Sequence, residues 1–157
     1  MFFLSFWKTL FPQKADNQFL GLKLSTHVFF LIAVVSTIRS LIHLFSPDGG
    51  AGSIAGIDLT VEGSQGIIFA FALWGSAQLV LAIIQWVVYF RYRSLIPLMY
   101  VLLIFEVLLR MLVGWIKPVT FAQTPPGAIG NRVILPLALV MLLLCFIKSK
   151  KLKPSNS

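Results

Sequence analysis

The stretch that decides the fold class is residues 95–116, with the sequence LIPLMYVLLIFEVLLRMLVGWI. It is apolar almost throughout, and a helix of about 20 such residues is long enough to cross the hydrocarbon core of a bilayer. Two charged residues, Glu106 and Arg110, lie inside it, four positions apart and therefore on one helical face. Ionisable groups in hydrocarbon are costly and normally face a partner or a watery cavity. This pair therefore indicates where a functional site should lie.

The composition of the whole chain agrees with this interpretation. Of 157 residues, 58% are hydrophobic and 11% are charged, whereas a soluble domain is usually about half apolar and about a quarter charged. The mean hydropathy is +0.91. Because the chain has too few charges to coat a water-soluble surface, we expect an integral membrane protein.

Four apolar runs approach the ~20 residues that a spanning helix needs. We expect transmembrane helices over residues 27–45, 65–88, 95–116 and 129–147, joined by connections that are rich in turn-forming residues. The short connection at residues 91–94 makes the second and third helices antiparallel neighbours. The predicted fold is therefore all-α, an antiparallel four-helix transmembrane bundle that occupies residues 27–147.

The segments outside this bundle are expected to lie at the membrane surface. Residues 2–11 are mainly apolar with a polar face and are too short to span, which favours an interfacial amphipathic helix. A signal peptide is the alternative, although the run has no basic start and no small-residue cleavage site. We thus expect residues 1–26 to form a cytoplasmic interfacial segment and residues 148–157 a basic cytoplasmic tail.

The charged residues set the expected topology. The N-terminal segment, the connection at residues 91–94 and the C-terminal tail are basic, whereas the first connection carries Asp48, Asp58 and Glu62. By the positive-inside rule, both termini are cytoplasmic, and we expect a bacterial inner membrane protein. The formal net charge of +8 is then explained by topology and anionic lipid, so no nucleic acid partner is expected.

This topology gathers polar residues from all four runs in the outer half of the bundle. The candidate ligand-binding residues are Arg39, His43, Glu62, Gln65, Glu106, Arg110 and Arg132. Three arginines face two glutamates, which leaves one positive charge uncompensated if all five are ionised. Water, an acidic loop residue such as Asp58, or a bound anion could balance that charge. The bound anion is of interest because guanidinium groups bind carboxylate and phosphate in a bidentate fashion.

A structural role is the alternative for the same side chains. Glu106 and Arg110 can neutralise each other as an i,i+4 pair, and Arg39 can join two helices or extend toward the interface. His43 is more simply explained by helix packing or an interfacial position than by metal ligation.

Other residues of the second run also favour contacts between helices. Gln78 and Gln85, which we place in the inner half, are expected to be interhelical hydrogen-bond donors rather than pore-lining residues. Ala72, Gly75 and Ser76 form a small-residue face suited to close helix contact.

The sequence contains no pattern that indicates catalysis. It has no nucleophile motif, no phosphate-binding glycine loop and no metal-ligand spacing, and its one cysteine, Cys145, cannot form an internal disulfide. We therefore expect no enzyme activity, no metal and no cofactor.

Three local features point to a family. A polar stretch ends in arginine at residues 36–39, Glu62 precedes Gly66 at the start of the second run, and the motif EVLLR at residues 106–110 is followed by Gly114. In these features the chain resembles small bacterial four-helix membrane proteins of the DoxX-like kind and related domains of unknown function, over most of residues 27–147. The resemblance implies an antiparallel bundle, and roles that are mostly unassigned or tied to accessory redox functions.

The leading functional hypothesis is a non-catalytic accessory subunit, or a bundle that binds a small ligand or lipid at the outer polar site. The alternatives are a small transporter of an anionic solute and a quinone-linked membrane redox subunit. The expected partners are membrane lipid and either another membrane protein or a second copy of the chain.

Overall fold

The computed structural model describes residues 2–119 and 124–148, the side chains from Phe6 onward. Its helices are α1 (Phe2–Leu10), α2 (Lys23–Phe45), α3 (Ser64–Arg91), the 3-10 turn η1 (Arg93–Leu95), α4 (Ile96–Ile116) and α5 (Pro126–Phe146). The described residues form no strand. Helices α2, α3, α4 with η1, and α5 are each long and apolar enough to cross a membrane. The all-α class and the four long apolar helices are thus confirmed.

The helices extend past the predicted runs mainly at their polar ends. Helix α2 begins at Lys23 instead of residue 27, and α3 continues to Arg91. Helix α5 begins at Pro126, where a missing backbone N–H costs nothing because the first turn has no intrahelical acceptor for it. Hydropathy marks the part of a helix that is apolar, whereas the backbone hydrogen bonds continue beyond it.

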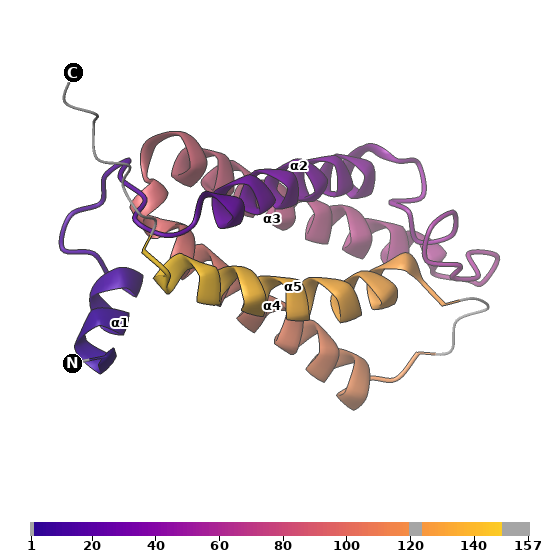
Figure 1. Ribbon diagram of the computed structural model, residues 1–157. Coiled ribbons are helices and arrows are strands. Elements are labelled where there is room, and N and C mark those ends of the chain that lie inside the picture. The colour runs from indigo at the N-terminus through magenta and orange to yellow at the C-terminus, as the bar shows by residue number, and fades with distance from the viewer. Residues whose placement is uncertain (1, 120–123, 149–157) are drawn as a thin grey trace, which may run out of the picture.

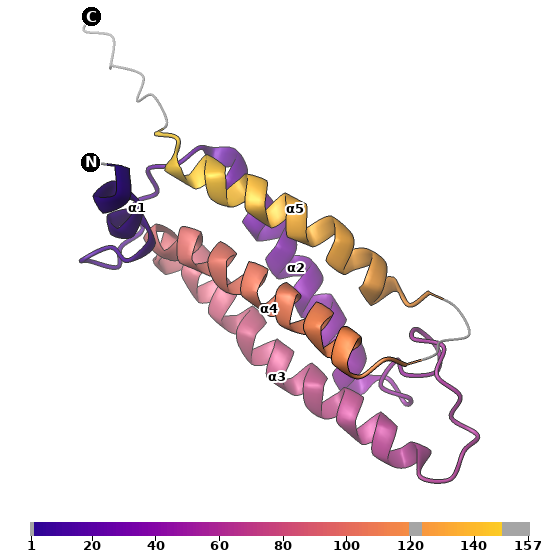
Figure 2. The same ribbon diagram turned by 90° about the horizontal axis from the view of Figure 1, so that it is seen from below.

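The chain reverses direction between successive long helices (Figure 1). Helix α2 leads away from α1, α3 returns, α4 leads away again and α5 returns (Figures 1 and 2). We call the end that holds α1 and the end of α5 the terminal end. We call the opposite end, which holds the loop of residues 46–63, the loop end.

The four long helices pack as two hairpins. Helix α2 packs mainly against α3, and α4 mainly against α5. The two hairpins meet through α2 with α5 and through η1, whereas α3 and α4 touch little along their length. Space is therefore left between the hairpins on the side where α3 faces α4.

The hydrophobic core lies in the half of the molecule nearest the termini, called here the terminal half. Its members are Phe29 and Ile32 of α2, Val88 of α3, Ile96 and Tyr100 of α4, and Ala138, Met141 and Cys145 of α5. Tyr100 is fully buried, and its hydroxyl donates a 2.6 Å hydrogen bond to the carbonyl of Ser25. Because all four helices contribute to this core, it joins the two hairpins.

Backbone hydrogen bonds add to this joint. The N–H of Leu22 donates to the carbonyl of Leu144 at 3.1 Å, which fixes the start of α2 to the end of α5. The hydroxyl of Ser94 donates to the carbonyl of Asp16 and accepts from its N–H, at 2.9 and 3.0 Å. The segment between α1 and α2 is therefore attached to the turn between α3 and α4.

The loop end is ordered by one aspartate. The carboxylate of Asp48 accepts hydrogen bonds from the N–H groups of Ser53 and Gly50 and from the hydroxyl of Ser46, at 2.6–2.8 Å. These bonds hold the pKa of Asp48 well below its usual range, the Ser53 N–H having the largest effect. The loop is thus folded back on itself, with Gly49 and Gly50 at positive φ.

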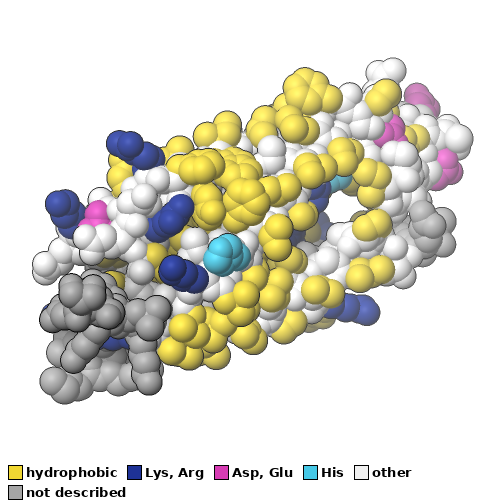
Figure 3. All heavy atoms as spheres, turned by 45° about the horizontal axis from the view of Figure 1, so that its top comes forward, with side chains coloured by type: hydrophobic (Ala, Val, Ile, Leu, Met, Phe, Trp, Pro, Cys, Tyr) yellow, Lys and Arg dark blue, Asp and Glu magenta, His cyan; other side chains and the backbone are white. Residues whose placement is uncertain are grey.

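The two ends differ in charge (Figure 3). The basic side chains of the terminal end are Lys8, Lys14, Lys23, Arg91, Arg93 and Lys148, and the acidic ones of the loop end are Asp48, Asp58 and Glu62. Hydrophobic side chains cover most of the surface between them (Figure 3). This is the distribution of charge expected of a chain that spans a bilayer.

Candidate functional site

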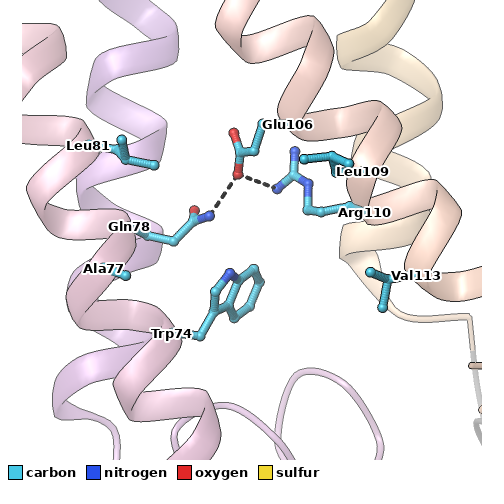
Figure 4. A pocket seen from close by; sticks show the side chains of 8 residues that line it. All are labelled: Trp74, Ala77, Gln78, Leu81, Glu106, Leu109, Arg110 and Val113. Carbon is cyan, nitrogen blue, oxygen red and sulfur yellow. Dashed lines mark hydrogen bonds and ion pairs between the residues drawn. The ribbon is translucent and has the colours of Figure 1, made fainter.

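The charged pair of α4 lies near the middle of that helix. Nη1 of Arg110 is 3.5 Å from Oε1 of Glu106. The same carboxylate oxygen accepts a 2.7 Å hydrogen bond from Nε2 of Gln78 on α3 (Figure 4). One oxygen atom therefore serves two donors and links α3 to α4 at mid-length.

These side chains form part of the wall of a cavity of about 500 Å³ between α3 and α4. The lining residues are Trp74, Ala77, Gln78 and Leu81 of α3 and Glu106, Leu109, Arg110 and Val113 of α4 (Figure 4). In both helices they follow the spacing i, i+3, i+4, i+7, which places them on a single face. The wall is thus mainly apolar and carries a compact polar cluster.

The cavity opens on the flank of the molecule. Its lining residues lie in the middle of α3 and α4, away from both ends, and these two helices touch little. The indole of Trp74 extends into the space between them (Figure 4). In a membrane, this opening faces the hydrocarbon of the bilayer instead of water.

A second guanidinium reaches the region from α2. Cζ of Arg39 lies 4.6 Å from the ring centroid of Trp74, a distance at which a cation and an aromatic face attract. Arg39 also interacts electrostatically with Arg110 and Glu106. Within the described residues, Arg39 has no carboxylate within 4.0 Å. One carboxylate therefore lies near two guanidinium groups but is paired only with that of Arg110, and the cluster has a net positive charge when all three are ionised.

The cluster also has unused hydrogen-bonding capacity. Nε of Arg110 is buried and has no hydrogen-bond partner. A buried donor without a partner costs about 1–3 kcal/mol. The side chains of Arg110 and Glu106 are 22% and 32% exposed, so both remain accessible from the cavity. The arrangement can accept a negatively charged group that bonds to arginine.

His43 of α2 contacts Trp74 on the side away from the cavity lining. It is buried, its ring lies 4.9 Å from that of Trp74, and its Nδ1 donates a 2.7 Å hydrogen bond to the carbonyl of Gly49. Gly75 packs against it so closely that a Cβ there would lie 2.7 Å from Cβ of His43. The predicted close contact of small residues is confirmed at Gly75, and His43 positions Trp74 without lining the cavity.

Three predicted site residues lie elsewhere. Glu62 and Gln65 are exposed at the loop end, and Gln65 is about 20 Å along α3 from Gln78. Arg132 is exposed near the start of α5. None of the three lines the cavity. The structure therefore brings together Arg39, Glu106 and Arg110, and it leaves Glu62, Gln65 and Arg132 apart from them.

Gln78 takes the place that we expected for Gln65. Its predicted role as an interhelical donor is confirmed, and it lies at mid-length of α3. Trp74 of α3 contacts both Arg39 and the cavity. The matching i, i+3, i+4, i+7 patterns on α3 and α4 were the signal in the sequence, since each contains a polar residue in an apolar face.

Across the described segments, no group of three or more His, Cys, Asp or Glu side chains is placed to hold a metal ion. Comparison with known proteins finds no matching family model, no matching curated protein and no matching solved structure. The geometry of the site is therefore the basis for a functional proposal.

Proposed function

We propose that this protein is an integral membrane protein with four transmembrane helices that binds an anionic ligand in the cavity between α3 and α4. The ligand is an amphiphile that carries a carboxylate or phosphate group on an apolar chain. The protein acts as a non-catalytic binding or accessory protein, with both termini in the cytoplasm of a bacterial cell.

The observation that carries the proposal is the unequal number of charges at mid-length of the helices. Arg110 is paired with Glu106, whereas Arg39 has no carboxylate within 4.0 Å among the described residues, and Nε of Arg110 is buried without a partner. An uncompensated charge in a low-dielectric region is expensive, and a bound anion offsets that cost. Guanidinium groups form charge-assisted hydrogen bonds to carboxylate and phosphate, which are stronger than neutral ones.

The remaining walls support an amphiphile over a small polar anion. Leu81, Leu109 and Val113 line the same cavity, and they offer apolar surface to a hydrocarbon chain. Since the opening lies on the flank, a ligand that is dissolved in the bilayer reaches it without crossing water. Because lipid tails are as apolar as these walls, the chain gains little on leaving the bilayer, and the bond between the anion and the guanidinium groups provides most of the affinity.

The test is binding of a fluorescent fatty acid and of its uncharged methyl ester to protein in nanodiscs. Arg110→Gln should weaken binding of the acid about tenfold or more, because a hydrogen bond to a charged group contributes about 1.5–3 kcal/mol. Binding of the ester should change little. Arg132→Gln is the matched control, because Arg132 is exposed and lies outside the cavity. Equal binding of acid and ester, or equal effects of the two variants, would contradict the proposal.

Glu106→Gln separates ligand binding from a purely structural role. If the cluster binds anions, this variant should bind the fatty acid more tightly, because it removes a carboxylate that competes for Arg110. If the cluster only joins helices, the variant should lose stability while the preference for acid over ester stays absent. The sign of the change in affinity therefore decides between the two roles.

The topology has its own test, made in a Cys145→Ser background. Ser53→Cys in the loop of residues 46–63 and Lys14→Cys before α2 introduce exposed thiols at opposite ends. An impermeant maleimide should label the first from the periplasmic side only and the second from the cytoplasmic side only. Labelling of both positions from one side would overturn the four-span topology.

A transporter of an anionic solute is the second candidate. It is favoured by Gln85, which is buried seven residues from Gln78 toward the terminal end and whose Oε1 has no hydrogen-bond partner. A polar path from the cluster toward the cytoplasm would need this amide. Flux of the fatty acid across proteoliposomes, lost in Gln85→Leu, would favour transport over binding alone.

The similarity to DoxX-like proteins adds the hypothesis of an accessory role beside another membrane protein. Purification in a mild detergent, followed by mass spectrometry of the intact complex, tests for such a partner. Recovery of the chain alone, at all detergent concentrations, would argue against it.

A further inference from the structure

A second cavity, of about 530 Å³, lies at the terminal end. It forms where α1, the segment before α2, the start of α4 and the end of α5 meet. The cavity between α3 and α4, called here the mid-membrane cavity, lies at mid-length of these helices, and it shares no lining residue with the terminal cavity. The terminal cavity needs a separate explanation.

Its floor is apolar and is held in place by close contacts. Phe19, Pro97 and Phe146 line it. The ring of Phe146 stacks on that of Phe6 of α1 at 4.9 Å, which holds α1 against α5. Gly21 approaches the end of α5 so closely that a Cβ there would lie 2.7 Å from the carbonyl oxygen of Cys145. The cavity is therefore built by specific packing.

Its rim is basic. Lys8 of α1 and Lys148, just after α5, both line the cavity and are exposed, and no acidic residue lines it. Within the described part of the chain, neither ammonium group has a carboxylate within 4.0 Å. Ser94 and Gln18 add polar side chains to the same wall. Two cations and neutral polar groups thus surround an apolar floor.

We propose that this cavity binds an anionic phospholipid from the cytoplasmic leaflet. Its phosphate lies between Lys8 and Lys148, and an acyl chain follows the floor past Phe19 and Phe146. Basic pockets beside membrane helices at the cytoplasmic surface suit such headgroups, because this leaflet is rich in anionic lipid. The apolar floor favours a lipid over free phosphate.

The site would also fix α1 at the membrane surface. Lys8 is near the end of α1 and Lys148 follows α5, so one phosphate between them joins the two ends of the chain. Bound lipid then acts as a further attachment of α1, beside the Phe6–Phe146 stack, while the Ser94–Asp16 hydrogen bonds hold the segment that follows α1.

The test measures binding of short-chain phosphatidylglycerol to the full chain in detergent by native mass spectrometry, with phosphatidylcholine and inorganic phosphate as comparison probes. Lys8→Ala/Lys148→Ala should weaken phosphatidylglycerol binding about 30-fold, because each lysine near a lipid headgroup contributes about 1 kcal/mol. Lys14→Ala/Lys23→Ala is the matched control, since it removes the same charge from exposed lysines that do not line the cavity. The control should lose less than threefold.

Three results would overturn the proposal. Equal losses in the two double variants would indicate diffuse electrostatic attraction and no site. Equal binding of phosphatidylcholine and phosphatidylglycerol would exclude recognition of the anionic headgroup. Competition by inorganic phosphate at the same concentration as the lipid would identify free phosphate as the ligand. Lys8→Arg/Lys148→Arg should retain binding, which shows that charge and not lysine itself is required.

Discussion

The terminal half of the bundle and the opposite half, called here the loop half, are built from the same kind of apolar helix, yet they pack differently. In the terminal half, all four long helices bury side chains around Tyr100, and none of the described charged residues enters the core. From mid-length toward the loop half, α3 and α4 enclose a cavity whose wall carries Glu106 and Arg110. The difference indicates a division of roles, in which the terminal half holds the hairpins together and the middle of α3 and α4 leaves a cavity.

The sharpest test of the division is the core of the terminal half. Tyr100→Ala should lower the free energy of unfolding by about 3–5 kcal/mol, because it leaves a cavity and breaks the hydrogen bond to Ser25. Tyr100→Phe should cost about 1 kcal/mol, since it removes only that bond. Leu102→Ala is the control on an exposed face of α4. Unfolding in mixed micelles with SDS, followed by helical circular dichroism, measures all three.

If Tyr100→Ala were no worse than Leu102→Ala, the terminal half would not be the joint of the two hairpins. The two halves would then contribute equally to stability.

The charged cluster should have a smaller effect on stability. Glu106→Gln leaves two guanidinium groups without a carboxylate and should cost about 2 kcal/mol, less than the about 3–5 kcal/mol of a fully buried pair because Glu106 is 32% exposed. In Glu106→Gln/Arg110→Leu the cost should be clearly below the sum of the single variants, because one of the two unpaired charges, that of Arg110, is gone. Additive effects would show that the two residues act independently. The same unfolding assay provides the measurement.

The loop end should have the smallest effect. Asp48→Asn removes a carboxylate that accepts two backbone N–H groups and a hydroxyl, and it should change global stability by less than about 1 kcal/mol, because solvent screens this site. Its folded-state pKa lies below its unfolded value of about 3.9. Its contribution is therefore complete at neutral pH and declines as the pH falls below about 4, through the folded pKa.

Hydrogen exchange of the Gly50 and Ser53 amides tests this assignment. In the wild type these amides should stay protected at neutral pH, whereas Asp48→Asn should expose them with little change in the amides of the terminal half. Equal loss of protection at both ends would contradict the independence of the two halves.

The fold was largely readable from the sequence, because the four apolar runs correspond to helices that are long enough to span. The antiparallel membrane topology stays a prediction, although the chain path and the charge at the two ends are compatible with it. The ends of the helices were less accessible. Lys23 and Arg91 are helical but polar, so a hydropathy pattern leaves them out.

The site was readable along one helix and not between helices. Glu106 and Arg110 were paired by their spacing, which needs only the helical repeat. Their partners Gln78 and Trp74 depend on how α3 is rotated and how far it stands from α4, and these quantities come from packing. Expected depth alone also placed Glu62 and Arg132 in the site. Both are exposed on the side of the loop end, and neither lines the cavity.

Because the mid-membrane cavity opens on the flank of the bundle, the concentration that determines its occupancy is that of the ligand in the bilayer. A hydrophobic anion distributes into the bilayer, where its number per lipid and not its number per litre of water determines occupancy. A modest intrinsic affinity then suffices, because the membrane holds the ligand at a high local concentration. Occupancy would follow the lipid composition of the cell, so that the protein would respond to the state of its own membrane.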